Sequence, residues 1–123
     1  MANGTTHGPL LQLSDDTFDD TMAHAGGVVV VEFWAAWCNP CRMIEPVVQQ
    51  VAADSARDGS GVSVAQVDTD QNRELANRYE INAVPTIIIF KDGAPRTRFV
   101  GLVGYDKLAT AIDSLSETDA AHE

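Results

Sequence analysis

Hydrophobic residues follow two patterns that alternate along the chain. Apolar runs of strand length occur at residues 28–34 (VVVVEFW), 62–68 (VSVAQVD) and 86–90 (TIIIF). The first run is apolar at nearly every position, which is typical of a central strand covered on both faces. Between and after these runs, apolar residues recur at steps of three and four, the period of an amphipathic helix. The alternation of the two patterns predicts an α/β protein.

Shorter signals complete the set of expected elements. The segment LLQL at 10–13 predicts another strand. After it, Ser14 can cap a helix with an acidic first turn, and Gly26 and Gly27 can end that helix. The turn KDG joins the third apolar run to RTRFVG at 96–101, which predicts a hairpin. Further helices are expected at 40–57, around Leu75–Tyr79, and from Tyr105 to Leu115.

The order of these elements predicts the architecture. Strands that alternate with helices and end in a hairpin and a helix describe a mixed sheet of about five strands, flanked by four helices on both faces. Residues 10–115 are long enough to form one domain with its own core. Residues 1–9 lack periodicity and predict a flexible N-terminal arm, and residues 116–123 predict a polar C-terminal tail.

The charge balance narrows the possible partners. Eighteen acidic residues against eight basic ones give a formal net charge of −10. Nucleic acid is disfavoured as a partner because no basic stripe exists to displace counterions from phosphates, and anionic membranes are disfavoured equally. Lys91 and Lys107 are the only lysines. The surface fits either an ordinary acidic protein or one adapted to a salt-rich cytoplasm, since such a surface repels itself in dilute salt.

The sequence shows neither a membrane-span pattern nor a secretory-signal pattern. No apolar run approaches the length of a membrane span. The N-terminal segment MANGTTHGPLL has neither the basic nor the apolar region of a secretory signal. We therefore expect a cytoplasmic protein, in a compartment that keeps thiols reduced.

Both cysteines lie in one segment, WAAWCNPCRM at 34–43, where Cys38 and Cys41 are three positions apart. A structural disulfide between them would close almost no loop and would remove little unfolded-state entropy. A structural zinc ion needs four ligands, and none of the three histidines has ligand spacing, so we expect no metal. Chance packing of two small apolar residues does not explain the neighbours. The spacing favours a reactive pair.

The flanking residues indicate how the two thiols differ. Cys38 ends a loop after a buried strand, and Asn39 and Pro40 can open a helix, because proline is tolerated at the first helical position. Cys38 would then face the free N–H groups and the positive end of the helix dipole, which stabilise a thiolate. Cys41 would lie one turn in and point inward. We expect an exposed attacking thiol and a shielded resolving thiol.

Glu32 interrupts the apolar run at 28–34. Burying a lone carboxylate is costly unless it is neutral or paired. An edge position that reaches water is one explanation, since fully buried glutamate is rare. The other is a proton acceptor for Cys41, whose pKa burial would raise toward the neutral range.

The segment VVEFWAAWCNPCRMIEP resembles the active-site segment of the thioredoxin family, and VAQVDTDQN, YEINAVPTIIIFKDG and VG follow in the family's order. The resemblance covers residues 10–115 and implies the thioredoxin fold and dithiol–disulfide exchange. It also implies that Trp37 packs beside the cysteines and that Pro85 is cis and faces the disulfide. A cis peptide there would turn the backbone of Val84 outward to pair with a substrate strand. Without the cysteines, Val-Pro-Thr would fit a strand-initiating proline.

Three positions depart from the family pattern. Asn39 stands where the family has Gly between Cys and Pro, and Glu32 stands where it has a buried Asp. Gln66 falls where many members have a lysine, so a charge that would favour the ionised carboxylate is missing. These departures concern the reduction potential and the pH profile rather than the type of reaction.

The resemblance implies a protein-disulfide reductase that needs no cofactor beyond its own Cys38–Cys41 disulfide. Cys38 attacks a substrate disulfide, and Cys41 resolves the mixed disulfide with help from Glu32. The expected docking surface comprises Trp37, Ala83, Val84, Pro85 and Gly101. The expected partners are thioredoxin reductase and disulfide-containing proteins, and we expect a monomer. Two alternatives remain open: an oxidant or isomerase of the same fold, which Asn39 allows, and a non-enzymatic binding module.

Overall fold

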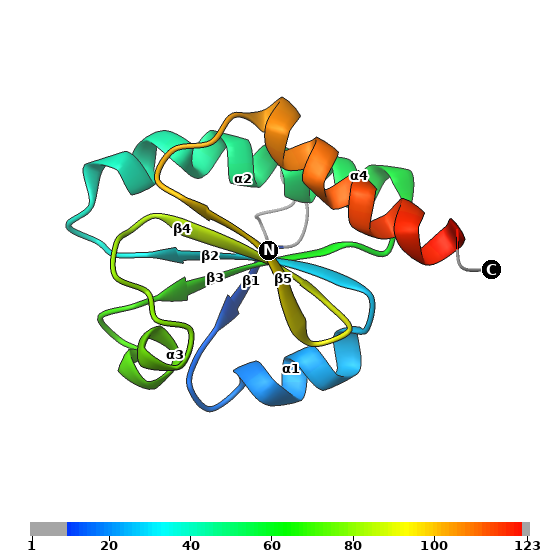
Figure 1. Cartoon of the computed structure of the whole chain (residues 1–123). Helices are drawn as coiled ribbons and strands as arrows, with labels where there is room; N and C mark the ends of the chain where they lie inside the picture. The colour runs from blue at the N-terminus through cyan, green and yellow to red at the C-terminus, as the bar shows by residue number, and fades with distance from the viewer. Residues whose placement is uncertain (1–9, 122–123) are drawn as a thin grey trace, which may run out of the picture.

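A five-stranded mixed sheet forms the centre of the chain (Figure 1). The computed structural model describes residues 10–121, with side chains through residue 116. The strands are β1 (Leu10–Leu13), β2 (Val28–Trp34), β3 (Ser63–Asp68), β4 (Thr86–Lys91) and β5 (Ala94–Val100). The helices are α1 (Phe18–Ala25), α2 (Asn39–Asp58), α3 (Arg73–Arg78) and α4 (Tyr105–Ala121). The predicted architecture is confirmed.

The strands lie in the order β1-β3-β2-β4-β5, which makes β2 central. Strand β3 pairs in parallel with both β1 and β2, whereas β2–β4 and β4–β5 are antiparallel. The parallel pairs need long crossover connections, and helices supply them, whereas the antiparallel β4–β5 pair needs only a short turn. Residues Asp92 and Gly93 form that turn with φ of 51° and 85°. Positive φ at both central residues suits the twist of a hairpin.

Helices cover both faces of the sheet, with α2 and α4 on one side and α1 and α3 on the other (Figure 1). Side chains alternate between the faces along a strand. In β2, Val29, Val31 and Phe33 pack in the core beneath α1 and α3. Val28 and Val30 pack in the core beneath α2 and α4. Glu32 has the same parity as Val28 and Val30, so its side chain lies on the α2 side.

Two element ends differ from the sequence-based expectation. Helix α1 begins at Phe18, so the prediction that Ser14 caps it is wrong. The carbonyl of Ser14 instead accepts the N–H groups of Thr17 and Phe18 at 3.1 and 2.9 Å, forming a turn ahead of the helix. Helix α4 continues to Ala121 and so includes most of the segment expected as a polar tail. The proposed arm at residues 1–9 lies outside the described residues.

Within the described residues, no helix is both long and apolar enough to cross a membrane.

Candidate active site

The two cysteines form a disulfide at the start of α2, with their Cα atoms 5.3 Å apart. Cys38 is the N-cap residue, and its Sγ accepts the N–H of Cys41 at 3.1 Å. Asn39 and Pro40 are the first residues of the helix, as their sequence predicted. A sulfur at this position receives both a hydrogen bond and the positive end of the helix dipole, and both lower the pKa of a thiol.

Both cysteines of the disulfide are buried. Cys38 is 2% exposed and Cys41 is 4% exposed, so the expectation of an exposed Cys38 is wrong for this oxidised form. The reason is local packing: the two cysteines cluster with Ala35, and Trp34 and Val84 pack against the cluster. The difference between the two sulfurs therefore lies in the N-cap hydrogen bond rather than in exposure.

The segment at 83–85 lies beside the disulfide. The Val84–Pro85 peptide is cis, and the carbonyl oxygen of Val84 is 3.6 Å from Cys38 Sγ. Gly101 has φ of 89°, and its N–H donates to the Pro85 carbonyl at 2.8 Å, which ties the end of β5 to this segment. The Thr86 hydroxyl donates to the carbonyl of Ala83 at 2.7 Å. These bonds fix the backbone next to the reactive sulfurs.

Two indole rings have different positions near the cysteines. Trp37 is 69% exposed, and its Nε1 donates to Asp70 at 2.9 Å. Trp34 is half-buried and packs against the cysteine cluster, a contact that the sequence analysis did not single out. Trp34 Nε1 is a buried donor with no hydrogen-bond partner among the described residues.

Glu32 is fully enclosed, with 1% of its surface exposed. Its strand lies between β3 and β4, so the alternative of an edge position that reaches water is wrong. Burial raises the pKa of Glu32 to about 7, the hydrogen bond from Gln66 opposes that rise, and the nearby charge of Glu45 adds to it. Gln66 Nε2 donates to Glu32 Oε1 at 2.8 Å, whereas Oε2 has no partner among the described residues.

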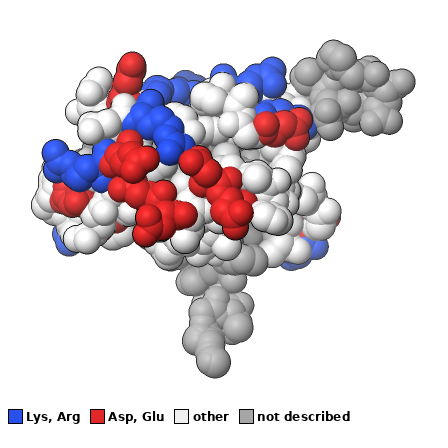
Figure 2. All heavy atoms as spheres, turned by 90° about the horizontal axis from the view of Figure 1, so that it is seen from below, with Lys and Arg blue, Asp and Glu red and all other residues white. Residues whose placement is uncertain are grey.

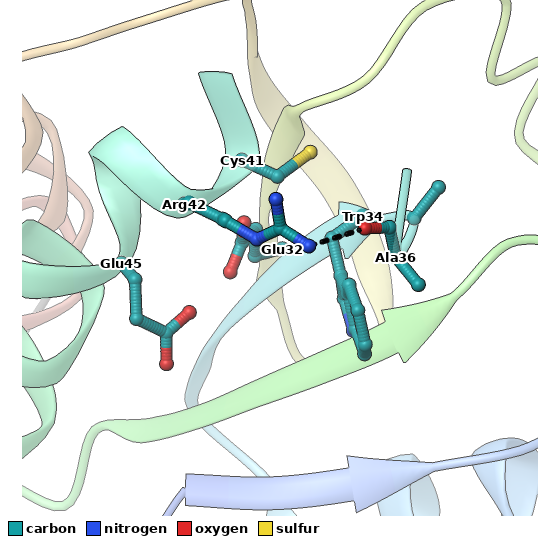
Figure 3. A pocket seen from close by; sticks show the side chains of 7 residues that line it. Glu32, Trp34, Ala36, Cys41, Arg42 and Glu45 are labelled. Carbon is teal, nitrogen blue, oxygen red and sulfur yellow. Dashed lines mark hydrogen bonds between the residues drawn. The ribbon is translucent and has the colours of Figure 1, made fainter. Parts of the chain in front are cut away.

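A pocket of about 290 Å³ joins the disulfide to Glu32. Figure 3 shows Glu32, Cys41, Arg42 and Glu45 around it. The Arg42 guanidinium donates to the Ala36 carbonyl at 2.9 Å and to Asn39 Oδ1 at 3.2 Å, so it is held at the pocket's border. The lining residues are Glu32, Trp34, Ala35, Ala36, Cys41, Arg42 and Glu45. A base that faces the same pocket as Cys41 can exchange a proton with it directly or through one water.

Sequence reasoning missed Glu45, although it carried a usable signal. Glu45 lies four residues after Cys41 on α2, and residues at that spacing share a helix face. An inward-facing Cys41 therefore places Glu45 over the same part of the sheet as Glu32. Among the described residues, no group of three or more His, Cys, Asp and Glu side chains is placed to hold a metal ion; His7 and His122 lie outside that range.

An N-cap disulfide beside a cis-proline segment, on a five-stranded sheet with helices on both faces, defines a dithiol–disulfide exchange domain. The family model for thioredoxin matches residues 9–114. The chain belongs to the thioredoxin family, and with its redox-active Cys38–Cys41 pair it is a thiol–disulfide oxidoreductase.

Individual relatives agree with this assignment. Thioredoxins of Staphylococcus saprophyticus and Staphylococcus aureus are 38% identical over 104 residues, covering 85% of this chain and 95% of theirs. A crystal structure of Malassezia sympodialis thioredoxin (Mala s 13) superposes with a TM-score of 0.75 at 36% identity, covering 89% of this chain and 92% of that one.

Proposed function

We propose that this chain works as a protein-disulfide reductase with Cys38 as nucleophile. The observation that carries the proposal is the N-cap geometry, in which Cys38 Sγ accepts the N–H of Cys41. After reduction, the same bond stabilises the Cys38 thiolate. The thiolate attacks one sulfur of a substrate disulfide, a Cys38–substrate bond forms, and the other substrate sulfur leaves as a thiolate.

Cys41 completes the reaction. Its thiol proton moves to the Glu32 carboxylate, and the resulting Cys41 thiolate attacks Cys38 Sγ. The Cys38–Cys41 disulfide forms and the second substrate sulfur leaves as a thiolate, so the substrate gains two electrons and the pair loses two. The shared pocket and the raised pKa of Glu32 support this role for the acid. A base that titrates near neutral pH matches its task.

The surface around the disulfide suits an extended protein substrate. Ala83 is exposed, Val84 is half-buried, and Pro85 is buried behind them. The backbone at Val84 lies against Cys38, which supports pairing with a substrate strand by main-chain hydrogen bonds. Trp37, directly before Cys38 in the chain, is exposed and adds an aromatic surface, and Gly101 adds no side chain to obstruct approach.

Partners and compartment follow from the proposed direction of electron flow. The oxidised pair must be reduced again, and a thioredoxin reductase is the donor implied by the family. No cofactor beyond the disulfide is required. We place this cycle in the cytoplasm, where thiols are kept reduced, and propose that the chain acts as a monomer.

Trapping of reaction intermediates tests the assignment of the two cysteines. Cys41→Ser should accumulate mixed disulfides with protein substrates, because Cys38 still attacks and nothing resolves the product. Cys38→Ser, the matched control, should accumulate none. Mass spectrometry of the trapped adducts checks both variants. Adducts on Cys38→Ser but not on Cys41→Ser would reverse the assignment.

The direction of reaction is tested by the reduction potential. Asn39 separates the cysteines together with Pro40, which keeps an oxidant or isomerase as a second candidate. Equilibrating the pair with glutathione buffers separates the candidates, because reductants and oxidants lie on opposite sides of the cellular poise. A reduction potential above about −200 mV, in the range of isomerases and oxidants, would contradict the reductase.

A further inference from the structure

A row of polar side chains crosses the sheet beneath the start of α2. Strand register places Gln12 opposite Gln66 and Gln66 opposite Glu32. Gln12 Nε2 donates to Gln66 Oε1 at 2.8 Å, and Gln66 Nε2 donates to Glu32 Oε1 at 2.8 Å. Carboxylates only accept, so the orientation of the Gln66 amide is fixed by its acidic partner.

A second carboxylate shares the same donor. Gln66 Nε2 also donates to Glu45 Oε1 at 3.0 Å, so one amide bridges two acids from different elements. The other oxygen of Glu45 accepts Gln49 Nε2 at 3.0 Å. Glu45 therefore accepts a hydrogen bond at each oxygen, and the two bonds hold its carboxyl group in one orientation.

Glu45 is the main charged group that acts on Glu32 in this pocket. The pocket lining comes from β2, the loop after it and α2, and its titratable or charged members besides Glu32 are Cys41, Arg42 and Glu45. On the sheet, Glu32 faces Gln66 on β3 and Ile87 on β4, neither of which titrates. The Arg42 guanidinium is directed to Ala36 and Asn39 instead.

We propose that Glu45 is a positioning residue for the exchange reaction: through Gln66 it holds the Glu32 carboxyl group beside Cys41, and its negative charge favours the protonated form of that group. The inference rests on the proposed function, in which Glu32 accepts the Cys41 proton. Two carboxyl groups that accept from the same amide nitrogen are close enough for the charge of each to disfavour ionisation of the other. A hydrogen bond donated to a carboxylate favours its ionised form. Glu45 and Gln66 therefore act on Glu32 in opposite directions.

The opposite signs provide the test. Glu45→Gln removes the like charge and should lower the titration midpoint of Glu32 by about half a pH unit or more. Gln66→Met removes the donor at similar volume and should raise the midpoint. Glu74→Gln, an exposed charge change on α3, should leave it unchanged. The midpoint is measured by ¹³C NMR of glutamate carboxyl carbons in the oxidised protein, with the Glu32 signal assigned by its loss in Glu32→Gln.

A second readout ties the titration to the reaction. The pH at which mixed-disulfide resolution becomes half-maximal should shift in Glu45→Gln in the same direction as the NMR midpoint. A structural role alone would lower the plateau without moving the midpoint, and that result overturns the proposal. Midpoints that coincide in wild type and Glu45→Gln overturn it as well. Since Glu45 is half-buried at the surface, this variant decides the question even if Gln66→Met does not fold.

Failure of the proposed function would look different. Wild-type protein would then show no turnover of disulfide substrates at any pH, while the NMR titration of Glu32 in the oxidised protein would still show its midpoint. That result would contradict the proposed function itself. An active wild type, combined with a Glu32 midpoint that does not move in Glu45→Gln, would contradict only the role of Glu45.

Discussion

At the scale of single residues, different physical effects act on the Cys38 sulfur and on the Glu32 carboxyl group. The N-cap hydrogen bond and helix dipole act on Cys38, and neither requires that the sulfur be exposed. Burial acts on Glu32, which lies 1% exposed in the central strand. A buried carboxyl group with a raised pKa costs folding free energy at neutral pH, so Glu32 does not serve stability there.

Glu32→Gln should therefore affect stability and rate in opposite directions. The folded pKa of Glu32 is about 7, against a reference value of 4.5. Well below pH 4.5 the group is protonated in both states and contributes nothing. As pH rises toward 7, only the unfolded state ionises, so stability falls, and above 7 the loss levels off. Removing the acid should restore up to about 3 kcal/mol at pH 8.

Resolution of the mixed disulfide should slow in the same variant by about 10-fold to 100-fold, because Cys41 loses its proton acceptor. Denaturant unfolding between pH 4 and 9 and single-turnover reduction are measured side by side for wild type and Glu32→Gln. A variant that is less stable at pH 8 and resolves as fast as wild type would make Glu32 a structural acid.

At the scale of elements, period and length predicted the type of each strand and helix, but not their mutual positions. The run at 28–34 identified a central strand because both of its faces are apolar. The alternation gives the face of Glu32 but not its neighbour, so the Gln12–Gln66–Glu32 row depended on strand register. Glu45 is different, because its spacing of four residues from Cys41 on α2 was a signal that the sequence analysis did not use. The start of α1 was misplaced because Ser14 closes a turn four residues earlier.

The burial of Cys38 was equally beyond a local pattern. The helix-opening residues Asn39 and Pro40 predicted the N-cap position correctly. Enclosure of the sulfur depends on Val84, which is 46 residues away in sequence and reaches Cys38 only through the pairing of β4 with β2. Chemistry set by a neighbouring turn was predictable, whereas contacts set by tertiary packing were not.

Helix α4 should contribute to stability mainly through its apolar contact with the sheet and α2. Leu108 is 0% exposed and packs in the cluster that contains Ile44, Val48 and Ile87. Leu108→Ala should cost about 2–5 kcal/mol, through lost transfer free energy and a cavity. Leu102→Ala is the matched control, because Leu102 is 55% exposed and the same atoms are removed. Equal losses in urea unfolding would show that α4 is not held by this contact.

At the scale of the whole molecule, acidic residues outnumber basic ones by ten. Figure 2 shows the face that α1 and α3 cover, where acidic and basic side chains lie side by side. Arg78 pairs with Asp19 at 2.7 Å and with Glu74 at 3.6 Å. With eighteen acidic and eight basic residues, such pairs cannot neutralise the surface, and a net charge of −10 remains. The folded chain concentrates that charge and repels itself.

Added salt should therefore stabilise the fold. The Debye length falls from about 10 Å at 0.1 M to about 3 Å at 1 M, which screens repulsion between exposed carboxylates. The melting temperature should rise by at least about 4 °C between 0.1 and 2 M potassium chloride, equivalent to about 1 kcal/mol.

A charge-reduced variant separates screening from other effects of salt. Asp16, Glu80 and Asp113 are exposed, and changing all three to amides reduces the net charge from −10 to −7. This triple variant should melt higher than wild type at 0.1 M and respond less to salt. Equal salt responses in the two proteins would assign the stabilisation to general salting-out of apolar surface, and a flat response in wild type would make the acidic surface unrelated to salt.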